Sequence, residues 1–276
     1  MNNENFQQYK PAKTIFEQLD HLNKNKRVQF NEMNRDSAGD KLLEYNYINV
    51  ITPFKHKFAK LNGKKEVEKI NGSHIYEKNV EFSEYYNFFI NERKYYPIII
   101  TNILDFEIHF KTIVAYYILT TYKLNDSNSL EHFLDTLKLK FSFLKSKYNK
   151  KRISHMNDHL DSLKKDIFKY ADIYCFFDRM SLGNILTIFT CLDNTIQNKI
   201  IKDLKNFQMT FNVDKVPDFI EKVFCLVSIR NCVMHCNSLE ILIRFYNPKL
   251  HELRKISDRK KYIKIIKSLS IEKTHE

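Results

Sequence analysis

The sequence predicts an all-α protein, and its composition is the first reason. Only four Gly and five Pro occur in 276 residues, and Trp is absent. Leu, Ile, Lys, Glu, Phe and Tyr carry most of the chain, and long stretches contain no helix breaker. Several of these stretches repeat apolar residues at helical spacing. The length suits one large helical domain with a small appended module.

Two short helices are predicted near the N-terminus, and they define a small helical module at residues 1–59. The first covers residues 11–23, where Pro11 precedes apolar residues at helical spacing, namely Ile15, Leu19 and Leu22. The second begins at about Asp36, whose carboxylate can cap it, and continues through Leu42, Leu43 and Tyr45.

A basic loop is predicted at residues 60–80. Gly63 and Gly72 lie there among Lys, Asn and Glu, and helical periodicity disappears. A short hairpin inside the loop is the alternative.

Residues 81–276 are predicted to form the main helical domain. A helix is expected after Ser83; it starts afresh at Pro97 and ends near Tyr122. Two helices should follow at residues 130–148, capped by Ser129, and at residues 152–170. After a break at Ser181–Asn184, a helix is expected at residues 195–207, and Pro217 opens the last main helix.

The net charge favours a polyanionic partner. The chain has 45 Lys and Arg against 33 Asp and Glu, a formal charge of +12. Such a surface binds phosphates and releases counterions, and the sixteen Tyr and twenty-two Phe can stack on unpaired bases. The alternative is that an AT-rich genome encodes many Lys, Asn, Ile and Phe residues without any nucleic-acid partner.

The chain is expected to lie in the cytoplasm, without a membrane span or a cofactor. It shows no secretory leader and no apolar run of eighteen residues. Its five cysteines are odd in number and scattered, which argues against a disulfide framework. Neither the group Cys232, His235 and Cys236 nor the pair His155 and His159 has a complete set of metal ligands, so no metal is expected.

The most informative segment is Ser228–His235, because it places Arg230, Asn231 and His235 in an otherwise apolar helical stretch. Each polar group would cost free energy on burial unless it is paired or lines a site. Arginine binds a phosphoryl group with two hydrogen bonds, and histidine transfers protons near neutral pH. The pattern therefore favours phosphate chemistry, with a purely structural polar network as the alternative.

Glu107 is a second candidate, because it lies four residues after Ile103 and three before Phe110, inside an apolar stripe. The stripe is formed by Ile100, Ile103, Leu104, Ile108 and Val114. Glu107 is expected either to orient Arg230 or His235, or to form a structural ion pair with another Arg or Lys. Arg230 and His235 lie about 140° apart on a regular helix. Either the helix loosens near Cys236, or a second copy of the chain completes the site.

Four segments together resemble Abi-like proteins of the AbiD/AbiF type, abortive-infection proteins of phage defence with a HEPN-type helical domain. These segments are Ile15–Leu19 continuing through Leu43–Tyr47, Ile103–Phe110, Met180–Asn184 and Ile229–His235. They occur in the order of the family across nearly the whole chain. Met234 and Cys236 stand where the family usually has a small residue and often a second histidine.

The resemblance implies a HEPN-like helical bundle that forms a homodimer and cleaves RNA without a metal. The ribose 2′-OH would attack the adjacent phosphate, giving a 2′,3′-cyclic phosphate. His235 would act as general base or acid, Arg230 would stabilise charge on the phosphate, Asn231 would orient both, and Glu107 would hold the arginine. The alternative is a defence effector that binds a structured non-coding RNA, with cleavage absent or repressed by it.

Overall fold

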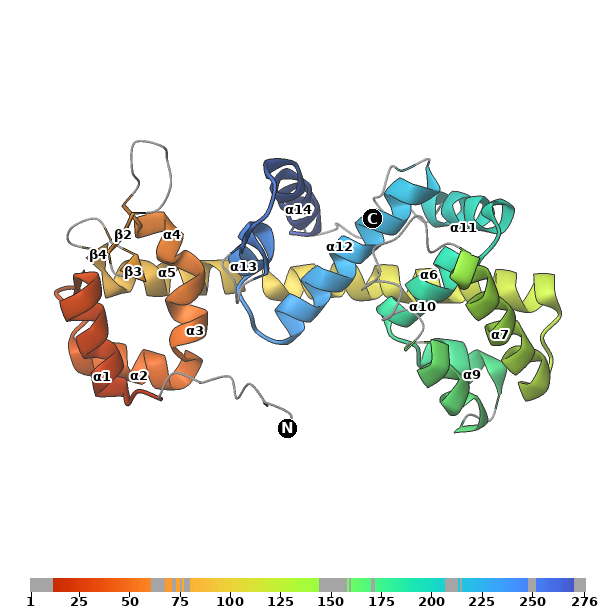
Figure 1. The fold of residues 1–276 in the computed structure, drawn as a ribbon, viewed down its shortest axis with the longest axis horizontal. Coiled ribbons are helices and arrows are strands. Elements are labelled where there is room, and N and C mark those ends of the chain that lie inside the picture. Colours follow the sequence, from red (N-terminus) through yellow and green to blue (C-terminus); the bar gives the residue numbers. More distant parts are fainter. Residues whose placement is uncertain are drawn as a thin grey trace, which may run out of the picture. The chain divides into compact units, whose positions relative to one another are not determined.

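The computed structural model confirms the all-α prediction (Figure 1). It describes residues 12–60, 68–70, 73–74, 76, 80–143, 158, 160–169, 172–206, 213, 215–247 and 252–270. The chain forms two compact units. Unit 1 comprises residues 1–95 and 236–252, and unit 2 comprises residues 96–235 and 253–276. The boundaries predicted from sequence at residues 59 and 80 stay a prediction.

The described residues of unit 1 form short helices and short strands of two or three residues that join in pairs. Its elements are α1 (Ile15–Asp20), the π-helix His21–Asn25, β1 (Val28–Gln29), α2 (Arg35–Tyr45), α3 (Tyr47–Val50), the 3-10 helix Thr52–Phe54, α4 (Lys55–Phe58), β2 (Lys69–Ile70), β3 (Ser73–His74), β4 (Val80–Glu81), α5 (Phe82–Arg93), α13 (Leu239–Arg244), β5 (Phe245–Asn247) and β6 (Glu252–Leu253). β1 pairs with β4 in parallel, and β2 pairs with β3 antiparallel.

Both N-terminal helices occur, and local hydrogen bonds explain where they begin. Thr14 and Glu17 form a capping box at the start of α1. The predicted cap of the second helix is wrong, because Asn34 rather than Asp36 accepts the Ser37 amide at 2.8 Å. The β2–β3 pair confirms the alternative of a hairpin inside the 60–80 segment.

Unit 1 has its own hydrophobic core, which packs α5 against the N-terminal helices. Leu19 and Leu42 are buried, at 1% and 2% exposure, together with the α5 residues Phe82 and Phe89 at 0%. The start of α5 is two residues earlier than predicted, because Glu81 and Glu84 form its capping box and Ser83 already lies within the helix.

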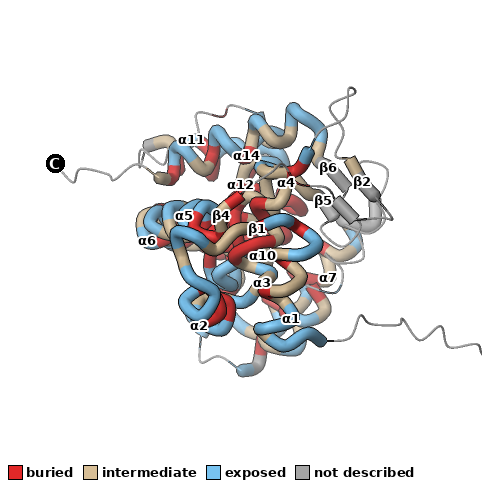
Figure 2. Tube along the Cα trace, turned by 90° about the vertical axis from the view of Figure 1, so that its left-hand side faces the viewer, coloured by how far each residue is buried: buried red, intermediate tan, exposed pale blue. Residues whose placement is uncertain are grey.

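Unit 2 contains the long helices. They are α6 (Tyr96–Tyr122), α7 (Ser127–Phe143), the 3-10 helix Ile167–Lys169, α9 (Ile173–Asp178), α10 (Leu182–Cys191), α11 (Asn194–Asn206), α12 (Val216–Met234) and α14 (Ile256–Leu269). α6 starts afresh beside Pro97, and Ser181 caps α10 at the predicted break. α10 is buried along most of its length (Figure 2).

Four phenylalanines join α6, α10 and α12 at the core of unit 2. The Phe110 ring centroid lies 5.4 Å from that of Phe189 and 5.6 Å from that of Phe219. Phe106 stacks on Phe110 one turn away, at 5.5 Å. These contacts fix the helices that carry Glu107 and Arg230.

Three sequence predictions in unit 2 need correction or lie outside the described residues. Ser129 does not cap α7, because the helix already begins at Ser127 and the Asp126 carboxylate accepts the Ser129 amide. α12 is not the last main helix, since α14 follows it. His155 and His159 lie outside the described residues.

Candidate functional site

The candidate site begins with Glu107 on α6, which is only 4% exposed. Its neighbours on the helix, Phe106 and Phe110, enter the aromatic core, so Glu107 is carried into an apolar environment with them. A carboxylate there requires positively charged partners, because an unpaired buried charge costs several kcal/mol.

Two cations supply that partnership. Glu107 Oε2 lies 3.2 Å from Arg230 Nε on α12, and Glu107 Oε1 lies 3.0 Å from Lys111 Nζ. The side chains of Arg230 and Lys111 are themselves 28% and 16% exposed. The structure thus joins Glu107 both to Arg230 and to a second cation, Lys111, so contacts of the kind expected by both sequence-based interpretations are present.

Sequence reasoning missed Lys111. It lies one helical turn after Glu107, and this i, i+4 spacing was the signal that could have found it. Lys111 Nζ also donates a hydrogen bond to the backbone carbonyl of Asp178, the last residue of α9, at 3.1 Å. Lys111 therefore ties the buried carboxylate to a third helix.

Asn231 lies on the exposed side of α12, next to Arg230. Its Oδ1 atom accepts a hydrogen bond from Arg230 Nη1 at 3.5 Å, which is at the long end of the range. Arg230 thus forms an ion pair with Glu107 through Nε, without a hydrogen bond between these two atoms, and contacts Asn231 through Nη1.

His235 lies just beyond the last residue of α12, where the helix ends. Its backbone amide donates to the Asn231 carbonyl at 3.1 Å, and the next residue, Cys236, has a positive φ of 54°. A left-handed residue after the last turn ends a helix, so α12 ends at Met234, directly before His235. The side chain is exposed. Within the described residues, no hydrogen bond or ion pair links its ring to Arg230.

This arrangement combines an anchored guanidinium with an exposed amide and an exposed imidazole within six residues. Anchoring through Nε removes much of the conformational freedom of the arginine, which reduces the entropic cost of holding an anion. An imidazole can accept or donate a proton. Guanidinium, amide and imidazole groups are the types of side chain that bind phosphates and transfer protons in proteins.

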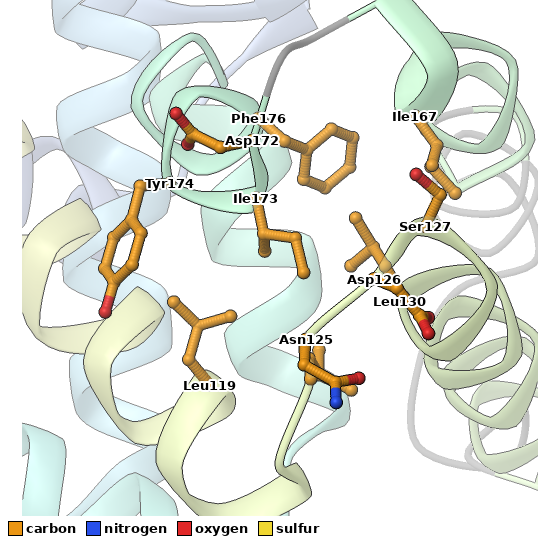
Figure 3. Close-up of a pocket in the computed structure, with 11 residues that line it drawn as sticks. Leu119, Asn125, Asp126, Ser127, Leu130, Ile167, Asp172, Ile173, Tyr174 and Phe176 are labelled. Carbon is orange, nitrogen blue, oxygen red and sulfur yellow. The ribbon is translucent and has the colours of Figure 1, made fainter.

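A separate pocket of about 350 Å³ lies elsewhere in unit 2, between α7, α9 and the end of α6 (Figure 3). Its two carboxylates accept hydrogen bonds from backbone amides at the starts of helices. Asp126 accepts the Ser129 amide at 2.7 Å, and Asp172 accepts the Cys175 amide at 2.7 Å. The pocket contains none of the motif residues.

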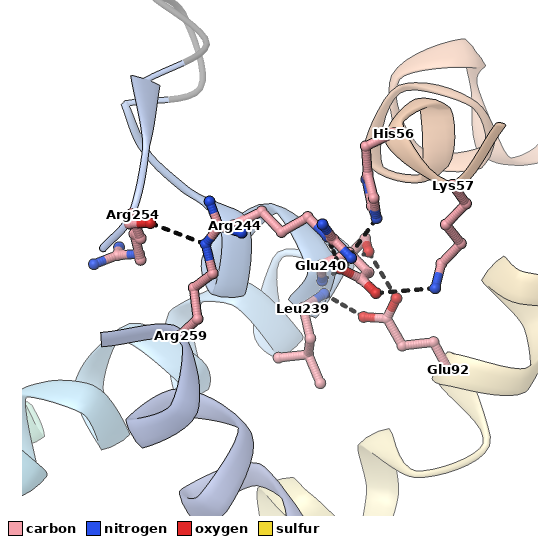
Figure 4. A network of polar contacts seen from close by, with 9 residues as sticks. His56, Lys57, Glu92, Leu239, Glu240, Arg244, Arg254 and Arg259 are labelled. Atoms are coloured by element: carbon pink, nitrogen blue, oxygen red, sulfur yellow. Dashed lines mark hydrogen bonds and ion pairs between the residues drawn. The ribbon is translucent and has the colours of Figure 1, made fainter. Parts of the chain in front are cut away.

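A second polar cluster lies in unit 1 around Glu240 of α13 (Figure 4). The Glu240 carboxylate lies 3.2 Å from Lys57 Nζ, 3.7 Å from His56 Nε2 and 3.0 Å from Arg244 Nε. Burial, aided by the nearby charge of Arg244, lowers the pKa of His56 to about 4. A histidine of this kind is neutral at pH 7.

Among the residues described, no group of three His, Cys, Asp or Glu side chains is placed to hold a metal ion. In the same portion of the chain, no helix has both the length and the apolar character needed to cross a bilayer.

Comparison with known families gives the chain its classification. A family model described as "Abi-like protein" matches residues 40–239, well over half of the sequence. The chain belongs to the Abi-like family. The matched region of this Abi-like protein includes Glu107 and the whole Arg230–His235 motif. Membership supports a role in abortive infection, a form of phage defence. No curated protein and no solved structure is significantly similar to the chain.

Proposed function

We propose that this Abi-like protein is a phage-defence RNA endonuclease and toxin with a HEPN-type active site at Arg230, Asn231 and His235. The observation that carries the proposal is the ion pair of Arg230 with the nearly inaccessible Glu107. A guanidinium paired at one edge, five residues before an exposed histidine, supplies two groups that can promote phosphate-ester cleavage.

The proposed reaction is internal transesterification of RNA. The ribose 2′-OH attacks the adjacent phosphorus, the bond to the 5′ oxygen of the next nucleotide breaks, and a 2′,3′-cyclic phosphate and a free 5′-OH result. His235 removes the 2′-OH proton or protonates the leaving oxygen. Arg230 stabilises the added negative charge, Asn231 orients the reacting groups, and Glu107 positions Arg230. DNA lacks the 2′-OH and is spared.

The decisive assay uses labelled RNA in the presence of EDTA, with protein stripped of bound nucleic acid. Wild-type protein should cleave and leave cyclic-phosphate ends, whereas Arg230→Ala and His235→Ala should not. His132→Ala is the matched control, because His132 is an exposed histidine on α7 of the same unit. Retained cleavage by both motif variants would falsify the proposal.

A homodimer with composite sites forms part of the proposal. Met234 is 56% exposed and lies beside the exposed Asn231 and His235, so the end of α12 presents an open face to a second copy. If each site takes Arg230 from one subunit and His235 from the other, mixed Arg230→Ala and His235→Ala proteins should recover about a quarter of wild-type activity on random exchange. No recovery, with subunit exchange verified, would place both residues in one subunit.

The second candidate function is an effector that binds a structured non-coding RNA, with cleavage absent or repressed by that RNA. The charge of +12 favours it. A discrete RNA species recovered with the purified protein would support it. A mixture of RNA lengths would indicate nonspecific binding only.

A further inference from the structure

Positive charge is concentrated at the end of the described chain. Residues 254–269, which are α14 and the two residues before it, contain seven Lys or Arg and one Asp, a formal charge of +6. This segment therefore carries half of the +12 of the whole chain. Among the helices and strands that the structure describes, α14 has the largest net positive charge.

α14 presents much of this charge on one face. Tyr262, Ile265 and Leu269 are buried and attach the helix to unit 2. The lysines Lys260, Lys264 and Lys267 are all exposed, at spacings of four and three residues. Such spacings place them along one side of the helix, over about 10 Å. We call these three residues the α14 lysine face.

The α14 lysine face is poorly neutralised. Within the described chain, none of its three lysines makes an ion pair, whereas the neighbouring Lys261 pairs with Glu221 of α12. Partial burial, reinforced by the charge of Lys264, lowers the pKa of Lys222 on α12. The electrostatic repulsion between Lys222 and Lys264 would be relieved by a bound anion.

The surface of α14 is better suited to contact a phosphate backbone than to enclose a small ligand. The backbone carbonyl of Arg254 accepts a hydrogen bond from Arg259 Nε at 2.9 Å, which directs that side chain to the protein itself (Figure 4). The three lysines are flexible point charges on a convex helix, which contact phosphates without reading base sequence. Phosphates recur about every 3.4 Å along each strand of a duplex, so 10 Å of helix can meet more than one.

We propose that the α14 lysine face binds the phosphate backbone of the RNA that this protein acts on. The choice of RNA among polyanions rests on the proposed function, whereas the binding surface itself rests on the charge and exposure of α14. Binding at this face is independent of base sequence and sensitive to salt. It contributes affinity, while Arg230 and His235 perform the chemistry.

The test compares two charge-matched triple variants in a His235→Ala background, so that RNA stays intact. One is Lys260→Gln with Lys264→Gln and Lys267→Gln. The control replaces three exposed lysines of unit 2 outside α14, namely Lys123, Lys199 and Lys202. Binding of a fluorescent single-stranded RNA is measured by anisotropy from low to moderate salt. Melting temperatures of both variants should match that of the parent, because all six positions are exposed.

The α14 variant should bind at least tenfold more weakly at low salt, with a salt slope smaller by about 2, since each lost phosphate contact removes about 0.7 for a single strand. The control should change affinity less than twofold. Equal losses in both variants would overturn the proposal, because they would show a nonspecific charge effect. Binding to phosphatidylserine vesicles but not to RNA would overturn it too, in favour of a membrane surface.

Kinetics separate this proposal from the proposed function. With His235 restored, the α14 variant should raise KM for RNA while kcat at saturating RNA stays near the wild-type value. A protein that binds RNA through α14 but never cleaves it contradicts the nuclease proposal alone. A protein that cleaves RNA with an unchanged KM in the α14 variant contradicts the lysine face alone.

Discussion

The Glu107 carboxylate lies 3.2 Å from Nε of Arg230, although the two residues belong to different helices far apart in the sequence. As a whole residue Glu107 is 4% exposed, whereas the side chain of Arg230 is 28% exposed. The pair therefore joins a buried residue of the core, Glu107, to a partly exposed residue of the motif, Arg230. Its removal should lower both stability and activity.

Replacing Glu107 by Gln should test this connection. The variant leaves Arg230 and Lys111 without their counter-charge and should lower the free energy of unfolding by about 2 kcal/mol, less than for a fully buried pair because Arg230 is partly exposed. Under the proposed function, kcat should fall about 100-fold with little change in KM, as expected for a misplaced arginine. Denaturant unfolding and steady-state RNA cleavage measure the two effects.

Glu107→Asp and Glu44→Gln are the controls. Glu107→Asp keeps the negative charge, so its kcat should be higher than that of Glu107→Gln. A merely structural role of Glu107 would not explain this recovery of kcat. Glu44 pairs with Lys41 on the surface of α2, so its replacement should leave both stability and kcat unchanged. Full activity in Glu107→Gln would remove Glu107 from the site.

Phe110→Ala should destabilise unit 2 by about 3–5 kcal/mol, because it deletes a ring at the centre of the four-phenylalanine cluster and leaves a cavity. Phe16→Ala is the same substitution at a side chain that is 72% exposed, and it should change stability by less than about 0.5 kcal/mol. Differential scanning calorimetry measures both variants. Similar effects in the two would contradict the assigned core.

Gly183→Ala should stabilise the protein by about 0.5 kcal/mol, since alanine favours the helix and restricts the unfolded chain. The added methyl group would meet Ser181 Oγ at 3.8 Å and Val227 Cγ1 at 3.9 Å, which are ordinary contacts. At Gly39 the methyl would lie 3.3 Å from Ile15 Cγ2, so Gly39→Ala should gain less. Urea midpoints compare the two, and a larger gain at Gly39 would contradict the packing.

Stability should fall as pH is lowered from about 6.5 to about 4, partly because of His56. Its folded pKa of about 4 lies below its ordinary value of 6.5, so in this window the unfolded chain binds a proton that the folded chain does not. The loss approaches about 1 kcal/mol per pH unit. His56→Gln should flatten the curve of unfolding free energy against pH, whereas replacement of the exposed His132 should not. An unchanged slope in His56→Gln would show that His56 is not the titrating group.

Local patterns were predictable where a few neighbouring residues decide the outcome. The break at Ser181, the restart at Pro97 and the helix after Pro217 follow from capping and from the missing amide of proline. Caps were less predictable where two candidates lie close together, as at Asn34 and Asp36. The sequence analysis did not predict α14, because its many charged residues are interleaved with the few apolar residues that anchor it.

The sequence by itself determined the helical class, the strong positive charge and the Arg230–Asn231–His235 motif, because composition, periodicity and spacing are local properties of the chain. The tertiary structure decided which cations Glu107 meets, since that depends on how α6, α9 and α12 pack. It also decided that α12 ends before His235 and that Lys260, Lys264 and Lys267 share an exposed face. A buried charge restricts the set of acceptable partners, but only the packed helices select which of them comes within contact distance.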